Sequence, residues 1–307
     1  MRTASIDIGT NTIRLLISEQ IGEVISKLYV NRVITRLGEG FSEDTRLLNP
    51  NAVERSLTAL KTFSEVIKKY NVNKIRAVAT SVVRESENGS EFIKQVAVKT
   101  GLRVEVISGE EEAKLTVLGV LNSVSVKAKE FIIFDIGGGS TEYVHIENSN
   151  IINLVSTNLG VVHLTEEFLK SEKETEQELA QLSLNIQKTL QENLENFDIT
   201  NKEGLILIGT AGTPTTLAAI NLKLEEYKPE LVNNFVLTQE MVLSTIENLI
   251  KIPKKDRAKI MGLEEGREDI LIAGALILIE TLRKHSQNSV IVSDGGVLEG
   301  IAYSQND

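Results

Sequence analysis

Two short segments of the sequence place an aspartate next to glycine and hydroxyl residues, a combination suited to holding phosphate. They are Asp7-Ile8-Gly9-Thr10-Asn11-Thr12 and Asp135-Ile136-Gly137-Gly138-Gly139-Ser140, and each follows an apolar, β-branched run. Glycine lets backbone N–H groups turn toward an anion, and an aspartate at the end of a strand can hold a hydrated divalent cation. The repeated motif therefore predicts two phosphate-binding hairpins, which would clamp one polyphosphate group if they face each other.

A third glycine loop, Gly209-Thr210-Ala211-Gly212-Thr213, lies between a predicted strand and a predicted helix. Such a loop directs the N–H groups of a helix start toward phosphate or ribose. One hairpin of this kind is as compatible with an ordinary turn as with a binding site. Three anion-directed loops in one chain favour phosphate or nucleotide binding.

Three consecutive glutamates, Glu110, Glu111 and Glu112, follow Ser108. One interpretation is a capped helix start, in which Ser108 is the cap and Glu111 completes a capping box. Three carboxylates exceed what a cap needs, however, and a carboxylate near a bound anion can direct the water that attacks a phosphoryl group. The segment therefore predicts a helix start that carries a catalytic carboxylate.

Arginines near these segments are candidate phosphate ligands, because a guanidinium binds phosphate oxygens with two donors. Arg14 lies just beyond the first hairpin, Arg84 lies in a polar loop, and Arg267 precedes an apolar helix. A single arginine is more often a solvated surface residue. For Arg267, an ion pair with Glu264 or Glu268 is an equal alternative.

Strands and helices that alternate along the chain must position these residues, and the alternation predicts an α/β fold with mixed, partly parallel sheets. Strands are predicted at residues 3–8, 13–18, 24–30, 74–79, 104–107, 131–134, 143–146, 151–155, 205–208 and 290–292. Helices are predicted from a cap at Asn49 or Asn51 to Ile67, and at residues 90–100, 110–122, 174–196, 213–224, 241–250 and 270–285. The 174–196 helix, rich in Glu and Gln, is expected to be a solvated surface helix.

The second half of the chain repeats the pattern of the first after the polar segment Ser123–Lys129, which is a candidate hinge. The length of 307 residues also favours about two domains. We therefore expect domains at 1–125 and 126–297, with a C-terminal helix at about 298–307 that packs back on the first.

Composition excludes several classes of function. The chain has no cysteine, and its three histidines, His145, His163 and His285, are scattered, so thiolate, zinc or triad chemistry is not expected. A net charge of −10 with no basic stripe argues against nucleic-acid binding. The N-terminus reaches Asp7 before any signal-peptide apolar region, and the apolar run Ile270–Ile279 is about half of a membrane-spanning helix. A cytoplasmic protein without membrane contact is expected.

The three glycine loops together resemble those of the actin-like ATPase and sugar kinase superfamily. The segments 79–88 and 107–114, with Asp7–Arg14 and Asp135–Glu142, resemble more narrowly the exopolyphosphatase/guanosine pentaphosphate phosphohydrolase (Ppx/GppA) family in its short two-domain form. The resemblance covers nearly the whole chain. It implies two actin-like (ribonuclease H-like) domains, each with a mixed central sheet flanked by helices, and an active site in the interdomain cleft.

The resemblance also implies an activity: release of terminal phosphate from inorganic polyphosphate or of the 5′ γ-phosphate from guanosine pentaphosphate. Metal-assisted attack of a water directed by Glu111 is expected, or by a neighbouring glutamate if the register is shifted by one. Glu111, Asp135 and Arg14 are the expected catalytic residues, and Asp7, Glu111 and Asp135 would hold Mg²⁺ or another divalent cation; the resemblance also allows a monovalent cation.

The phosphate-contacting residues implied by the resemblance are Asp7, Gly9, Thr10, Asn11, Thr12, Ser81, Arg84, Gly137, Gly138, Gly139, Ser140, Gly209, Thr210, Gly212, Thr213 and Arg267, with Asn88 lining the cleft. Polyphosphate and guanosine penta- or tetraphosphate are the expected ligands, and a homodimer is allowed. One position departs from the family pattern, because His163 stands where many relatives have an arginine. A neutral imidazole there would weaken phosphate binding.

Two other classes of function share these loops. The first is an ATP-dependent kinase or ATPase of the actin-like superfamily, and the second is a non-catalytic sensor of guanosine tetra- or pentaphosphate. The consecutive acids after Ser108 and the Arg84 loop favour hydrolysis over transfer to a sugar hydroxyl, and an intact Glu111 and Asp135 favour turnover over sensing.

Overall fold

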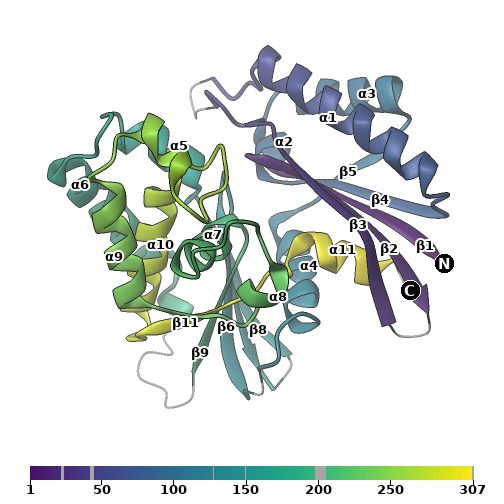
Figure 1. Ribbon diagram of the computed structural model, residues 1–307. Coiled ribbons are helices and arrows are strands. Elements are labelled where there is room, and N and C mark those ends of the chain that lie inside the picture. The colour runs from purple at the N-terminus through teal and green to yellow at the C-terminus, as the bar shows by residue number, and fades with distance from the viewer. Residues whose placement is uncertain (22–23, 42–44, 127, 149, 198–204, 306–307) are drawn as a thin grey trace. The chain divides into compact units, whose positions relative to one another are not determined.

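The computed structural model describes the chain except residues 22–23, 42–44, 127, 149, 198–204 and 306–307. The chain forms two compact units (Figure 1). Unit 1 comprises Met1–Gly119 with Gly296–Asp307, and unit 2 comprises Val120–Gly295. Within the candidate hinge, residue 127 lies outside the described part. Ser123 and Ser125 are hydrogen-bonded to Asn233 and Asn234 of unit 2.

Unit 1 is built on a mixed sheet with the strand order β3-β2-β1-β4-β5. The strands are β1 (Arg2–Ile8), β2 (Thr12–Ile21), β3 (Val24–Ile34), β4 (Lys74–Ala79) and β5 (Val104–Val106). β1, β2 and β3 are antiparallel neighbours, whereas β1, β4 and β5 are parallel. The hairpin motif is therefore the turn between the central strand, β1, and its neighbour β2.

Helices cover both faces of this sheet, and residues on both sides of β1 are accordingly buried. On one face α1 (Pro50–Lys69) and α3 (Gly89–Thr100) pack against each other and the sheet (Figure 1). On the other, α4 (Gly109–Leu121) and α11 (Val297–Ser304) cover β1, β2 and β4. The side chain of Asn49 accepts a hydrogen bond from Asn51 N at 2.9 Å, so one of the two predicted caps of α1 is confirmed.

Unit 2 repeats this arrangement with the strand order β10-β11-β9-β6-β7-β8. The strands are β6 (Glu130–Ile136), β7 (Thr141–Glu147), β8 (Asn150–Thr157), β9 (Ile206–Thr210), β10 (Val236–Thr238) and β11 (Ser289–Val292). β6, β7 and β8 are antiparallel, and β6, β9 and β11 are parallel. The second Asp-Ile-Gly motif thus begins at the end of a strand equivalent to β1, and the internal duplication is visible in the topology.

The helices of unit 2 are α5 (Val161–Phe168), α6 (Glu176–Asn193), α7 (Gly212–Asn221), α8 (Pro229–Val232), α9 (Gln239–Leu249) and α10 (Leu271–Lys284). Two 3-10 turns, at Glu195–Phe197 and Lys254–Lys259, complete its described helical segments. α10 is buried between its neighbours α6 and α9, as its apolar sequence predicts (Figure 1). No helix in the described residues is long and apolar enough to span a membrane.

The predicted α/β fold class with two mixed sheets flanked by helices is confirmed. The polar loop expected at residues 80–85 is wrong, because Ser81–Glu85 form a short helix, α2. Five residues show too little of a helical repeat for the sequence pattern to reveal it. The surface helix expected to start at Glu174 starts two residues later, and Glu174 itself is buried beside Arg257.

Candidate functional site

The turn between β1 and β2 is held by short backbone and hydroxyl contacts. Gly9 N donates to Thr12 O at 3.1 Å, and Gly38 N donates to Thr10 O at 2.9 Å. The hydroxyls of Thr10 and Ser81, both buried, lie 3.0 Å apart in a hydrogen bond. The structure therefore brings the first hairpin and the start of α2 together.

An aspartate and an arginine are paired at the base of this hairpin. Arg14 donates from Nε at 2.9 Å and from Nη2 at 2.6 Å, and both bonds end on Oδ2 of Asp7. The two residues face each other across β1 and β2, and Asp7 is buried. Two predicted site residues therefore form one ion pair.

A second ion pair connects α2 to the start of α4. Nη1 of Arg84 donates to Ile107 O at 2.9 Å and to Oε2 of Glu112 at 3.1 Å, and its Nη2 lies 3.8 Å from Glu85. The Arg84 side chain is 25% exposed and that of Glu112 only 11%. A carboxylate from the acidic run is thus held against an arginine whose Nε makes no hydrogen bond within the described residues.

The three glutamates of the acidic run point to three different cations. Glu110 is exposed and accepts a hydrogen bond from Lys114 at 2.6 Å, which lowers the pKa of this carboxyl. Glu111 accepts from Nη2 of Arg76 at 3.1 Å. The predicted Ser108 cap is present, since its hydroxyl accepts a bond from Glu111 N at 3.1 Å, but the Glu111 carboxylate is directed to Arg76.

The position of Arg76 decides where Glu111 points. Arg76 lies three residues before the end of β4, opposite Ser5 of β1, and so about 10 Å below the strand ends that carry the hairpin. Its other bonds go to Glu105 and to the hydroxyl of Ser304 in α11. Glu111 is therefore held away from the strand ends, whereas Glu112 is paired with Arg84 of α2.

The second hairpin, between β6 and β7, rests on the start of α5. Gly137 N donates to Ser140 O at 2.9 Å, which repeats the closure of the first hairpin. The N–H groups of Val161 and Val162 donate to the carbonyls of Gly137 and Gly138 at 3.1 and 2.9 Å. The predicted phosphate loop of unit 2 is thus fixed by hydrogen bonds from the first turn of a helix.

The third loop leaves the sheet beside this hairpin, because Thr210 at the end of β9 lies opposite Asp135 of β6. The hydroxyl of Thr210 donates to Gly295 O at 2.7 Å. A Cβ on Gly212 would lie 2.0 Å from Nη1 of Arg267, so this guanidinium lies directly over the first residue of α7. The structure therefore groups four predicted site residues of unit 2 at one end of its sheet: Asp135, Thr210, Gly212 and Arg267.

Arg267 forms one of the two ion pairs that its sequence allowed, the one with Glu264. Its Nε donates to Oε2 of Glu264 at 2.7 Å, and its side chain is 11% exposed. The ion pair is thus present, and it holds the guanidinium over Gly212. By contrast, Thr213 is buried against Gly274 of α10, so its hydroxyl packs inside the unit.

Asn88 and His163 were also singled out in the sequence, and the structure shows the surroundings of each. The side chain of Asn88 accepts from Leu48 N at 2.8 Å and donates to Leu48 O at 3.1 Å, which holds the segment before α1. His163 lies on α5, and burial lowers the pKa of its imidazole. A neutral imidazole at pH 7 is therefore expected at this position.

Glycines outside the motifs also shape the loops. A Cβ on Gly38 would lie 2.3 Å from Cγ2 of Thr10, and one on Gly160 would lie 2.2 Å from the backbone of Gly139. Both glycines let a neighbouring segment approach a predicted phosphate loop. Sequence reasoning missed them, although a glycine within an otherwise apolar segment, as in Leu159-Gly160-Val161, is a usable signal.

Within the described ranges, no group of three or more histidine, aspartate or glutamate side chains is placed to hold a metal ion. Mg²⁺ in phosphate sites is usually bound by one or two carboxylates together with waters and substrate oxygens. The single buried carboxylates Asp7 and Asp135 fit such a cation arriving with a phosphate. Glu111 fits this role less well, because its bond to Arg76, in the middle of β4, holds its carboxylate away from the strand ends that carry the hairpin.

A comparison with known protein families decides the relationship. A sequence model of the Ppx/GppA phosphatase family matches residues 16–307. The chain belongs to this family. The fold agrees, since the crystal structure of the Aquifex aeolicus family member has a TM-score of 0.82 and 32% identity, covering 100% of this chain and 97% of the other. The actin-like two-domain fold implied by the sequence resemblance is thereby confirmed.

Two curated relatives show how the family domain is used. Exopolyphosphatase 2 of Mycobacterium tuberculosis is 31% identical over 317 residues, which cover 99% of this chain and 98% of the relative. A bifunctional 3-dehydroquinate synthase/phosphatase of Fusobacterium nucleatum is 35% identical over 311 residues. That alignment covers 97% of this chain, but the chain spans only 46% of the Fusobacterium protein.

Proposed function

We propose that this Ppx/GppA family chain hydrolyses the terminal phosphoanhydride of inorganic polyphosphate, and that the 5′ γ-phosphate of guanosine pentaphosphate is an alternative substrate. The near full-length similarity to a protein named exopolyphosphatase supports the first substrate. The observation that carries the proposal is the placement of α2. Its first residue, Ser81, is bonded to Thr10 of the hairpin, and Arg84 in its last turn is bonded to the carboxylate of Glu112.

We further propose that Glu112, rather than the predicted Glu111, directs the attacking water. The sequence also allowed a neighbouring glutamate to take this role, and the contacts of unit 1 favour Glu112. Glu111 is bonded to Arg76, in the middle of β4, whereas Glu112 is bonded to Arg84, itself a candidate phosphate ligand. A carboxylate beside the arginine that binds the phosphate is well placed to accept a hydrogen bond from the attacking water.

The remaining site residues bind and orient the anion in this proposal. Arg14 and Arg84 would donate to phosphate oxygens, and the backbone N–H groups of 137–139, with the Ser140 hydroxyl, would hold the terminal phosphate. Asp7 and Asp135 would hold a divalent cation such as Mg²⁺. When bound, this cation neutralises negative charge on the phosphate oxygens as the bond to the leaving phosphate breaks.

The test is phosphate release by the full chain, measured side by side on tripolyphosphate, long-chain polyphosphate, guanosine pentaphosphate and ATP, each with and without Mg²⁺. Two matched variants, Glu112→Gln and Glu111→Gln, differ by one position and retain a hydrogen-bonding side chain. We expect Glu112→Gln to lower kcat at least about 100-fold, the size of a lost general base. We expect Glu111→Gln to lower kcat no more than a few-fold.

Each outcome of this test is informative. A large loss of kcat in Glu111→Gln with normal turnover in Glu112→Gln would support Glu111, the residue predicted from the sequence, as the one that directs the water. If wild-type protein binds polyphosphate but releases no phosphate from any substrate, the hydrolase proposal is wrong and a binding function replaces it. A parallel incubation of ATP with and without a sugar acceptor tests the kinase alternative, and consumption of ATP only in the presence of the acceptor would indicate a kinase.

A further inference from the structure

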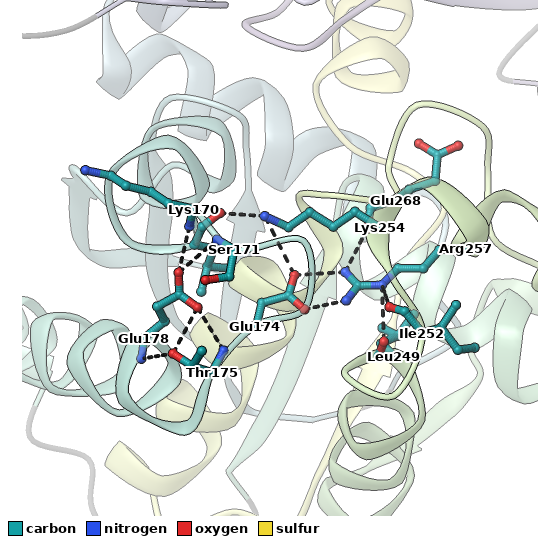
Figure 2. Close-up of polar contacts among 11 residues, drawn as sticks. Lys170, Ser171, Glu174, Thr175, Glu178, Leu249, Ile252, Lys254, Arg257 and Glu268 are labelled. Carbon is teal, nitrogen blue, oxygen red and sulfur yellow. Dashed lines mark hydrogen bonds and ion pairs between the residues drawn. The ribbon is translucent and has the colours of Figure 1, made fainter.

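A fully buried arginine connects three segments of unit 2. Arg257 is 0% exposed, and Figure 2 shows its guanidinium bonded on every side. Nη1 donates to Oε1 of Glu174 at 2.9 Å and to Glu268 O at 3.1 Å, and Nη2 donates to Oε2 of Glu174. Nε donates to Leu249 O at 3.2 Å and to Ile252 O at 3.0 Å. One side chain thus joins the end of α9 to the segments before α6 and α10.

Stability alone is a poor explanation for this pair. Both side chains are 0% exposed, so both charges have lost their water. Desolvation of a buried ion pair offsets most of its attraction, and apolar residues of similar size often stabilise a protein equally well or better. The bonds of the guanidinium nevertheless fix the geometry of the segments that they join. We call Arg257, Glu174 and Lys254 the buried cluster. Two segments lead from this cluster to predicted phosphate-binding loops of unit 2.

The first segment leads to the second hairpin. Nζ of Lys254 lies 4.0 Å from Oε1 of Glu174 and donates to Leu169 O at 2.5 Å, at the C-terminal end of α5 (Figure 2). At its other end, α5 donates two backbone hydrogen bonds to the carbonyls of Gly137 and Gly138. The cluster therefore holds one end of a short helix whose other end holds the predicted phosphate loop.

The second segment leads to the third loop. Arg257 binds the carbonyl of Glu268, and the neighbouring residue, Arg267, lies over Gly212. The backbone of Arg267 is also fixed, because its carbonyl accepts a bond from Leu271 N at 3.1 Å at the start of α10. A shift of this segment would displace the Arg267 guanidinium from the start of α7.

We propose that Arg257, held by Glu174, is a positioning residue that sets the second hairpin and the Arg267 guanidinium relative to each other. The proposal rests on the proposed function, in which the second hairpin binds the terminal phosphate, and it adds Arg267, a phosphate contact that the sequence resemblance implies, as a ligand of the same substrate. Arg257 touches no substrate itself. Its loss changes the spacing of groups that must bind one anion, and so lowers kcat/KM without unfolding the chain.

The decisive variant replaces the whole pair by apolar residues, Glu174→Leu with Arg257→Met, so that no buried charge remains unpaired. The melting temperature is expected to stay within a few degrees of wild type. The kcat/KM for tripolyphosphate is expected to fall at least tenfold. The control is Glu280→Gln, since Glu280 is also a buried carboxylate, and its hydrogen bonds within the described residues come from Ser183, Gln187 and Arg283, all outside the two loops.

Amide hydrogen exchange in the full chain without substrate tests the positioning independently of turnover. In the double variant, the amides of Val161, Val162, Arg267 and Leu271 should exchange at least tenfold faster. Lys254→Met should affect only the two valines, because Lys254 contacts the α5 side of the cluster. The Glu280→Gln control should leave all four amides unchanged.

Two results would overturn the proposal. One is unchanged exchange at both groups of amides in the double variant, and the other is a kcat/KM that stays at the wild-type value while the chain remains folded. Wild-type protein without phosphate release would refute the proposed function alone, since the exchange measurement would still report whether Arg257 positions the two loops.

Discussion

His285 gives unit 2 a defined sensitivity to acid. It is the residue that ends α10, it is 0% exposed, and neither ring nitrogen has a hydrogen-bond partner among the described residues. Burial, with smaller effects of Lys284 and His145, lowers the pKa of His285 from 6.5 to about 4. The folded protein therefore holds this imidazole neutral over a pH range in which the unfolded chain protonates it.

The magnitude follows from proton linkage. The folded-state pKa of His285 lies below its unfolded value, so the stability that depends on the neutral ring is complete above pH 6.5 and is lost as pH falls toward 4. Between pH 7 and pH 5 this group should remove about 2 kcal/mol from the free energy of unfolding, and about 3 kcal/mol by pH 4. His285→Phe keeps an aromatic ring and removes the titration.

The assay is urea unfolding of both proteins, followed by circular dichroism at pH 7 and pH 5. Any cost of fitting the larger phenylalanine ring is the same at both pH values, so it cancels in the comparison. We expect wild-type protein to lose about 2 kcal/mol more than His285→Phe over this interval. Equal losses in the two proteins would refute the argument, because they would show that the buried ring does not resist protonation.

Three further changes test unit 1. Gly119→Ala would place a Cβ 2.0 Å from Gly296 O, and because backbone cannot move aside easily, the free energy of unfolding should fall by about 3 kcal/mol, measured by urea unfolding. Ser108→Ala removes the cap of α4 and should cost about 1 kcal/mol in the same assay, with no loss expected from Ser108→Asp. Arg14→Met leaves Asp7 without its ion pair and removes a proposed phosphate ligand, so the KM for tripolyphosphate should rise about tenfold; an unchanged KM would exclude Arg14 from the site.

The sequence predicted those features that depend on neighbouring residues. Each Asp-Ile-Gly motif was expected to end one strand and begin a hairpin, and the bonds Gly9 N to Thr12 O and Gly137 N to Ser140 O show two equivalent turns. The cap at Asn49 and the burial of α10 could also be predicted, because the cap depends on local side chains and the burial on one apolar run.

Contacts between residues far apart in the sequence could not be predicted from it. Arg257 and Glu174 are 83 positions apart, and nothing in either local segment indicates that the two charges meet in a buried cluster. A glutamate that precedes a Glu- and Gln-rich helix looks like part of a solvated surface, and only the arrangement of α5, α9 and α10 shows the contrary. Apolar periodicity indicates which face of an element is buried, but carries no information about which polar residue on another element it meets.

The acidic run illustrates the same limit at the site itself. Successive residues on a helix point about 100° apart, so a change of one position turns a carboxylate toward a different part of the fold. At the start of α4 that change separates Glu111, bonded to Arg76 below the strand ends, from Glu112, bonded to Arg84 of α2. The sequence could place a carboxylate in this turn, because helix starts favour acids and hydrolysis needs one. Choosing between adjacent glutamates required the positions of both arginines, and those depend on β4 and on α2, a helix too short for the sequence pattern to reveal.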